Sequence, residues 1–231
     1  MVSPYRLFVY ALFFVPVLIH SAAPLTHLVL AKKFLEKTPY KLEEIQKRSF
    51  LLGTLFPDIR YLGEISRENT HPLGLTLNDI CQSPTPFIAG MRLHAWIDEI
   101  REQFAVQCNV YALIEEIGGA HRATLLKLVE DEILYEDNTF PLLLTGFAEE
   151  ELNFGIPLET VQKWHFFLKT YLRNRPSTLL QELSEKDLPL FNVPSPIIKE
   201  WSKQLPLLAQ REDLKNYVKD LFEIILNCFE F

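Results

Sequence analysis

The sequence has few cysteines and few glycines, and each scarcity excludes a class of protein. The cysteines are Cys81, Cys108 and Cys228, an odd number without a Cys-x-x-Cys pair, so neither a disulfide framework nor a cysteine zinc site is indicated. We expect all three to be buried apolar residues; one disulfide with one free thiol is the alternative. The chain has only 8 glycines and no Asn-Gly or Asp-Gly pair, so β-hairpins are not indicated either.

The sequence also lacks an excess of positive charge. Its formal net charge is −7, and no run or stripe of lysine and arginine stands out. Binding of nucleic acid by neutralisation of phosphates is therefore not expected, and we find no clear nucleic-acid surface. A bound metal ion would add positive charge that this count does not include.

The N-terminus carries an apolar run that is too short to cross a membrane. Residues 7–19 are apolar, follow one arginine and precede small residues. A membrane-spanning helix needs about 20 apolar residues, whereas this layout is typical of a secretory signal peptide. We expect residues 1–21 to be a signal peptide of an exported protein, periplasmic or secreted; an uncleaved N-terminal membrane anchor is the alternative.

The remainder of the chain has helical periodicity and no alternating strand pattern. We expect helices over residues 25–37, 42–55, 85–109, 118–137, 157–174, 194–210 and 211–231, with a long irregular loop over 58–86. The sequence therefore predicts an all-α fold, a single domain over residues 22–231 with roughly seven to nine helices.

Five candidate metal ligands, three histidines and two aspartates, stand out in the first hundred positions. His94 and Asp98 are four apart in "FIAGMRLHAWIDEI", which places both side chains on one face of a helix. His27 lies in "PLTHLVLA", Asp58 follows a helix-ending proline in "FLLGTLFPDI", and His71 lies in "NTHPLG". Neutral imidazole and carboxylate are ligands that suit zinc.

Each of these residues also has an explanation without a metal. His94 and Asp98 could form a buried hydrogen-bonded pair, and Asp58 could cap the next turn. His71 could be a solvated loop residue, and His27 a satisfied core histidine. The metal hypothesis depends on the set as a whole.

The ordered set "THLVLA", "FLLGTLFPDI", "THPLG" and "FIAGMRLHAWIDEI" resembles the zinc-dependent phospholipase C family, which is related to the fungal single-strand nucleases. The resemblance covers residues 24–102 and continues more weakly through "LLKLVEDEILYE". It implies an all-α fold with a cluster of metal ions in a cleft.

The resemblance also implies a ligand set. Asp58, His71, His94 and Asp98 would hold a first zinc ion, and Asp98 would bridge to a second zinc ion that also takes His27. In the family the mature N-terminus completes this second site, and cleavage after Ser21 would make Ala22 that terminus. Asp58 and Asp98 would be the catalytic residues as well as metal ligands.

The chain departs from the family at the third zinc ion. The family places a histidine soon after the bridging aspartate, and then a histidine and an acidic residue four apart. Here "EIREQF" follows Asp98, and Lys127 and Asp131 hold the later pair of positions. A charged lysine is not a metal ligand, so we expect the third site to be absent or altered. We expect Lys127 to be a surface lysine paired with Asp131 four residues later; the alternative is that its charge replaces that of the missing zinc ion.

By this resemblance we expect a metal-dependent hydrolase of phosphate diesters of the phospholipase C kind. The resemblance implies two zinc ions, and zinc would lower the pKa of a bound water to about 7. Its partner would be a phosphodiester substrate, with phospholipid as a candidate. One alternative is a non-catalytic zinc-binding helical interaction domain that has lost the third site. Another is a helical protein without a metal.

Overall fold

The computed structural model describes residues 23–38, 40–62, 65–135, 149–190 and 193–229. Within these ranges the chain is helical and forms no strand beyond one isolated bridge between Leu190 and Val193, so the all-α prediction is confirmed. None of the helices described here is long and apolar enough to cross a membrane. The predicted signal peptide and the proposed Ala22 terminus lie outside the described residues.

The helices predicted from periodicity are present with small changes in their bounds. They are α2 (Pro24–Lys37), α3 (Glu44–Leu55), α6 (Pro86–Gln107), α8 (Arg122–Leu134), α10 (Leu158–Arg173), α12 (Ser195–Leu208) and α13 (Glu212–Cys228). Helix α11 (Pro176–Glu185) was not predicted. The short helices are η1 (Phe56–Leu62), α4 (Arg67–Thr70), α5 (Leu77–Cys81), η2 (Val110–Ile114), α7 (Glu115–Gly118), η3 (Gly119–His121) and α9 (Glu149–Leu152).

The prediction of an irregular loop over residues 58–86 was wrong in part. Most of η1 and all of α4 and α5 fall within it. One or two helical turns are too short to show an apolar period, so they leave little signal in the sequence. The start of α5 does have a capping pattern in the sequence. The Thr76 hydroxyl accepts a hydrogen bond from the Asp79 amide, and the Asp79 carboxylate accepts one from the Thr76 amide.

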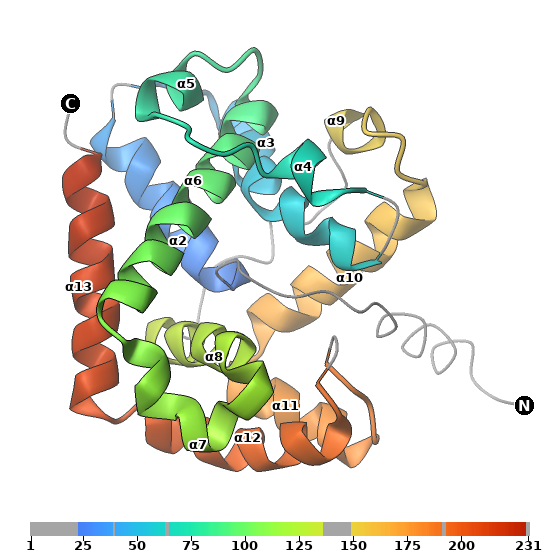
Figure 1. The fold of residues 1–231 in the computed structure, drawn as a ribbon. Helices are drawn as coiled ribbons and strands as arrows, with labels where there is room; N and C mark the ends of the chain where they lie inside the picture. The colour runs from blue at the N-terminus through green and yellow to red at the C-terminus, as the bar shows by residue number, and fades with distance from the viewer. Residues whose placement is uncertain (1–22, 39, 63–64, 136–148, 191–192, 230–231) are drawn as a thin grey trace, which may run out of the picture.

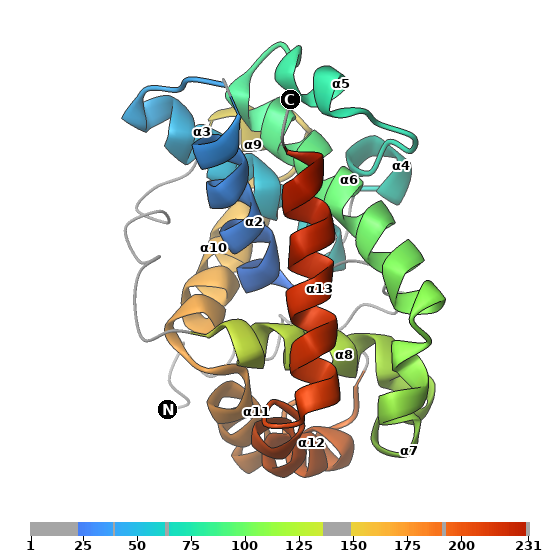
Figure 2. The same cartoon turned by 90° about the vertical axis from the view of Figure 1, so that its left-hand side faces the viewer.

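Helix α6 runs through the upper part of the molecule beside α2 and α3 (Figures 1 and 2). Helix α13 packs against α2 and α6. Helix α8 crosses between this upper group and the lower pair α11 and α12. Buried residues occur all around α6, as expected for a helix enclosed by others. The described helices share one hydrophobic core.

Helices α3 and α6 cross with their backbones in direct contact at two glycines. A Cβ atom on Gly53 would lie 2.1 Å from the Phe87 carbonyl oxygen, and one on Gly90 would lie 2.0 Å from the Phe50 carbonyl oxygen. No other residue fits there without moving a helix. The close crossing places the carbonyl group of Thr54 in α3 beside the His94 ring in α6.

Asp131 of α8 caps the first turn of α2. The preceding residue, Ala23, offers no side-chain cap. Instead the amides of Leu25 and Thr26 and the hydroxyl of Thr26 donate to the Asp131 carboxylate at 2.7–2.9 Å. These amides would otherwise be unsatisfied at the start of a helix. The contact fixes the end of α2 that carries His27.

The carboxylates on either side of Asp131 hold other helices in the same way. Glu130 accepts hydrogen bonds from Arg101 Nε of α6 at 3.0 and 2.8 Å and from the Tyr217 hydroxyl of α13 at 3.2 Å. Glu132 accepts from the amide and the hydroxyl of Ser177, both at 2.9 Å, in the first turn of α11. Asp131 also accepts from the Tyr171 hydroxyl of α10, so these consecutive buried acids join α8 to five helices.

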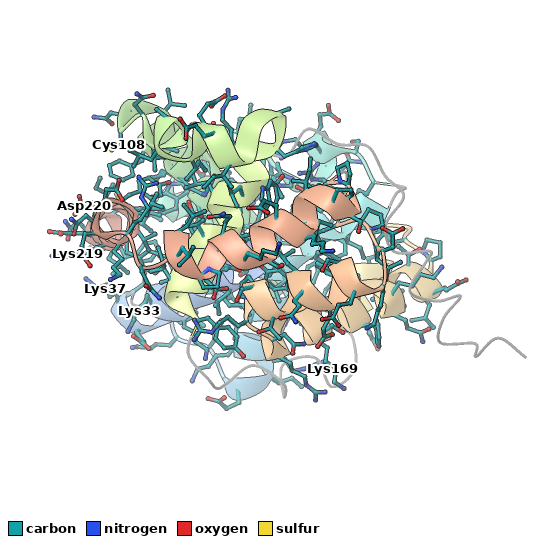
Figure 3. The ribbon with its side chains drawn as sticks, turned by 90° about the horizontal axis from the view of Figure 1, so that it is seen from below. Lys33, Lys37, Cys108, Lys169, Lys219 and Asp220 are labelled. Carbon is teal, nitrogen blue, oxygen red and sulfur yellow. The ribbon has the colours of Figure 1, made fainter. Side chains whose placement is uncertain are left out.

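The expectation of three buried cysteines was wrong. All three are free thiols, but Cys108 and Cys228 are exposed and only Cys81 is partly buried. Cys108 follows the last turn of α6 and Cys228 ends α13; Figure 3 shows Cys108 at the molecular surface.

Candidate metal centre

The structure brings together all five residues that the sequence predicted as ligands. Three elements supply most of them: His27 lies in the first turn of α2, Asp58 in η1, and His94 and Asp98 in α6, while His71 directly follows α4. The five side chains are buried, with residue exposures between 1% and 5%. Positions 71 residues apart in the chain thus converge on one point in the core.

Asp98 lies at the centre of the histidines. Its Oδ1 atom lies 3.2 Å from Nε2 of His27, and its Oδ2 atom lies 3.5 Å from Nε2 of His71 and 3.4 Å from Nε2 of His94. Two overlapping groups form, one of His27, His94 and Asp98 and one of Asp58, His71 and His94. Within each group the ligand atoms lie within 4.8 Å of one another, so these buried residues could bind a metal ion.

The tautomer of neutral His94 is determined by its other ring nitrogen. Nδ1 lies 2.8 Å from the carbonyl oxygen of Thr54. A carbonyl oxygen can only accept, so Nδ1 carries the proton. In a neutral ring, Nε2 then has a free lone pair, and that lone pair faces the Asp98 carboxylate. This is the arrangement in which a backbone carbonyl orients a metal-binding histidine.

His71 is held in the same tautomer by a side chain. Its Nδ1 atom lies 2.8 Å from the hydroxyl oxygen of Thr70, and that hydroxyl donates its own proton to the Arg67 carbonyl oxygen at 3.3 Å. The Thr70 oxygen therefore accepts from Nδ1–H of His71. The lone pair on Nε2 of His71 is left facing the centre of the cluster.

His27 is positioned by packing rather than by a hydrogen bond. Its ring stacks on that of His94, with centroids 3.7 Å apart and planes 13° from parallel. Both of its ring nitrogens are buried, and neither has a hydrogen-bond partner among the described residues. The capped first turn of α2 fixes the position of its backbone.

This arrangement fits a bound metal better than a network of hydrogen bonds. The Nε2 atoms of His27, His71 and His94 are buried and have no hydrogen-bond partner in the described part of the chain. Buried polar atoms without a partner are costly, and lone pairs that face a carboxylate repel it. A divalent cation between them would satisfy every one of these atoms.

The electrostatics of the cluster keep its carboxylates ionised. Burial alone would raise the pKa of the Asp98 carboxyl, but the neighbouring rings of His94, His27 and His71 hold that pKa well below its usual value. Burial similarly opposes ionisation of Asp58, yet the charges of His94 and Arg60 lower its pKa. Ionised carboxylates are the form that binds a metal.

The histidines differ in their affinity for a proton. Burial, together with the neighbouring His94, lowers the pKa of His27 to about 4, and burial also lowers the pKa of His71. Burial disfavours charge on His94 too, but the Asp98 and Asp58 carboxylates raise its pKa overall. In metal-free protein, Nε2 of His94 can therefore be protonated. A metal ion that binds this nitrogen has to displace the proton.

Lys127 is buried, so the prediction of a surface lysine was wrong. Its residue exposure is 6%, and burial lowers its pKa to about 7 against the opposing attraction of Asp58. Lys127 also interacts electrostatically with Asp98. The reason lies in the tertiary structure: α8 packs against α2, so the face that carries Lys127 and Asp131 points into the molecule.

The residues at the expected third metal site serve other purposes. Asp131 accepts hydrogen bonds from the first turn of α2 and from the Tyr171 hydroxyl at 3.0 Å. The possible ligand groups within the described residues do not include Asp131. A buried lysine and a helix-capping aspartate thus occupy these positions.

Sequence reasoning missed the groups that orient the ligands. Thr70 was recognisable in principle, because a hydroxyl residue immediately before a histidine can reach Nδ1. The Thr54 carbonyl left no signal, since any residue offers a carbonyl group. Arg60, whose Nη2 atom lies 3.7 Å from Oδ1 of Asp58, was also missed. The available signal for Arg60 was that a basic residue lies two positions after Asp58, a predicted ligand.

Comparison of the chain with protein-family models, with curated protein sequences and with solved structures finds no match. The resemblance to the zinc-dependent phospholipase C family therefore stays a prediction. The all-α fold and a buried cluster of histidine and aspartate able to bind a metal ion are what the structure itself establishes.

Proposed function

We propose that this protein hydrolyses phosphate diesters, in the manner of a phospholipase C, with two zinc ions held by His27, Asp58, His71, His94 and Asp98. One observation carries the proposal. Oriented histidine lone pairs surround the Asp98 carboxylate, and they form two overlapping ligand groups rather than one.

The donor set favours zinc. Imidazole nitrogen and carboxylate oxygen suit zinc, whereas calcium and magnesium prefer oxygen ligands alone. Asp98 has one oxygen toward His27 and the other toward His71 and His94, as a carboxylate that bridges two ions would have. When bound, two zinc ions would lower the pKa of water and neutralise charge on a phosphate group.

The protein's own residues would hold this centre in place. The Thr54 carbonyl and the Thr70 hydroxyl fix the rings of His94 and His71. Arg60 lies against the Asp58 carboxylate and donates to the Tyr61 hydroxyl at 2.8 Å, which limits its movement. Such supporting contacts set ligand orientation and the strength of metal binding.

A second candidate function follows from the burial of the ligands. Exposures of 5% or less are typical of a structural metal site, which stabilises a fold without an open position for substrate. The protein would then be a zinc-stabilised helical domain that binds a partner and catalyses no reaction.

Metal analysis combined with an activity assay tests the proposal. We expect about two zinc ions per wild-type chain after dialysis and hydrolysis of a chromogenic phosphate diester. Asp98→Asn should lose both ions and the activity, because one Asp98 oxygen lies toward His27 and the other toward His71 and His94. Asp220→Asn is a matched control, since Asp220 projects from the outer face of α13 (Figure 3) and should change neither measurement.

Two results would decide against the proposed function. Wild-type protein that retains no metal, and whose melting temperature a chelator does not change, would exclude a metal centre. Bound zinc with no hydrolysis of any diester, and a large loss of stability on removal of zinc, would favour the structural candidate.

A further inference from the structure

A set of buried cations lies beside the candidate metal centre. Arg60 follows Asp58 in η1, and its residue exposure is 5%. Arg101 lies three residues after Asp98 on the same face of α6, and its exposure is 1%. Lys127 of α8 interacts electrostatically with both of these arginines and with the two aspartates. Arg60 and Lys127 thus bring buried positive charge to Asp58, and Arg101 interacts with Lys127.

Two of these cations have a buried N–H group without an acceptor. The Nε atom of Arg60 and the Nη2 atom of Arg101 are buried and make no hydrogen bond with the described residues. Arg101 is otherwise well held, since its Nε atom donates to both oxygens of Glu130. Buried guanidinium donors are rarely left without an acceptor. These two N–H groups indicate an anionic ligand.

The charge balance indicates the same ligand. Two zinc ions would bring four positive charges to a centre whose protein ligands are neutral histidines and two carboxylates, Asp58 and Asp98. The Glu130 carboxylate is already engaged by Arg101. Arg60, whose guanidinium lies beside Asp58, therefore adds to an excess of buried positive charge, which is costly unless an anion offsets it.

We propose that Arg60, Arg101 and Lys127 form an oxyanion subsite that takes the phosphoryl oxygens of the substrate beside the metals. This inference rests on the proposed function, because the phosphoryl group has to reach the metal centre. The unsatisfied histidine nitrogens require a cation, and the unsatisfied arginine N–H groups require an oxyanion. A phosphoryl group bound to metal ions satisfies both sets of atoms.

Binding of inorganic phosphate to zinc-loaded protein tests the subsite without an activity assay. Zinc content is measured first, and phosphate is then titrated calorimetrically at constant ionic strength. Lys127→Met keeps the length of the side chain and removes its charge, and Arg60→Gln keeps an N–H donor and removes the charge. Both variants should retain zinc and raise the phosphate Kd roughly tenfold or more, as for loss of a charge-assisted hydrogen bond.

The control is Lys219→Met, which removes one positive charge from the exposed face of α13 (Figure 3) and should leave the phosphate Kd unchanged. Unchanged phosphate affinity in Lys127→Met and Arg60→Gln at full zinc content would overturn the subsite. Loss of zinc from both variants would also overturn it, because the cations would then act on the ligands. If Lys127→Met does not fold, Arg60→Gln decides by the same two measurements.

The failure of the proposed function is distinguishable from the failure of the subsite. Wild-type protein without zinc in the first measurement overturns the proposed function, and the subsite with it. Wild-type protein that holds zinc but does not bind phosphate overturns the subsite alone.

Discussion

Two buried polar regions of this molecule differ in whether the protein itself provides hydrogen-bond partners for their polar atoms. In the acidic run of α8, residues Glu130, Asp131 and Glu132, every carboxylate oxygen accepts a hydrogen bond from a neighbouring helix. In the candidate metal centre, the Nε2 atoms of three histidines face inward and have no hydrogen-bond partner in the described residues. The first region is complete within the fold, whereas the second requires something that the chain does not supply.

Burial and charge alone would not have separated these regions. Both are nearly inaccessible to solvent, and both hold ionisable groups that come from several helices. The difference lies in the pairing of individual atoms, which is how a stabilising network can be told from a binding site. The predictions below test this difference, from the largest expected effect to the smallest.

Glu130→Gln should destabilise the fold most. It removes the charge of the closer of the two carboxylates beside the buried Arg101 guanidinium, and removal of one partner from a buried pair costs about 3–5 kcal/mol. Urea unfolding should show this loss equally with and without zinc. Glu36→Gln, which removes an exposed pair with Lys33, should cost under about 1 kcal/mol. If zinc restored the stability that Glu130→Gln loses, the acidic run of α8 and the candidate metal centre would be energetically coupled, and the comparison between them would fail.

Lys127 gives the stability of metal-free protein a dependence on pH. Its folded-state pKa of about 7 lies below its ordinary value of 10.5, so below pH 7 the lysine is charged in both states and the folded state bears the cost of burial. That cost is relieved as the pH rises from about 7 to 10.5. Wild type should therefore gain stability relative to Lys127→Met over this range, on the order of 5 kcal/mol.

The measurement for Lys127 is the difference in unfolding free energy between wild type and Lys127→Met at several pH values, which cancels groups common to both. A difference that stays constant from pH 7 to 10 would contradict the burial of a charged lysine. Lys219→Met, at an exposed position, should show no such trend.

Zinc should stabilise the fold only through the histidine centre. A metal that binds the folded state alone adds about 2.7 kcal/mol when its concentration is one hundred times Kd. We expect this increment in wild type and its loss in His94→Ala, because His94 belongs to both ligand groups. His121→Ala, outside the centre, should retain it. An increment that survives in His94→Ala would place the metal elsewhere.

Thr70→Val should weaken metal binding with a small effect on the fold. It removes the oxygen that holds Nδ1–H of His71 while it keeps the shape of the side chain. Loss of such a supporting contact typically lowers metal affinity about 10- to 100-fold. Zinc titration against a competing chelator measures this change. Thr170→Val, which loses only a bond to the Phe166 carbonyl oxygen on α10, is the control and should bind zinc as wild type does.

The sequence predicted the candidate ligands better than their surroundings. His94 and Asp98 were predictable because helical spacing alone places them on one face. His27, Asp58 and His71 were grouped with them by resemblance and residue type, since no local rule connects α2, η1 and α4 to α6. The buried position of Lys127 was not predictable, because the sequence does not show which face of α8 packs against the other helices.

By itself the sequence determined the helical class, the approximate bounds of the longer helices and the residue types of a metal site. These properties depend on neighbours within a few turns of the chain, which the sequence displays directly. Only the tertiary structure decided that Asp131 caps α2, that Thr54 and Thr70 orient two histidines, and that α8 turns Lys127 inward. Each depends on contacts between helices far apart in the chain, and those contacts exist only once the helices have packed.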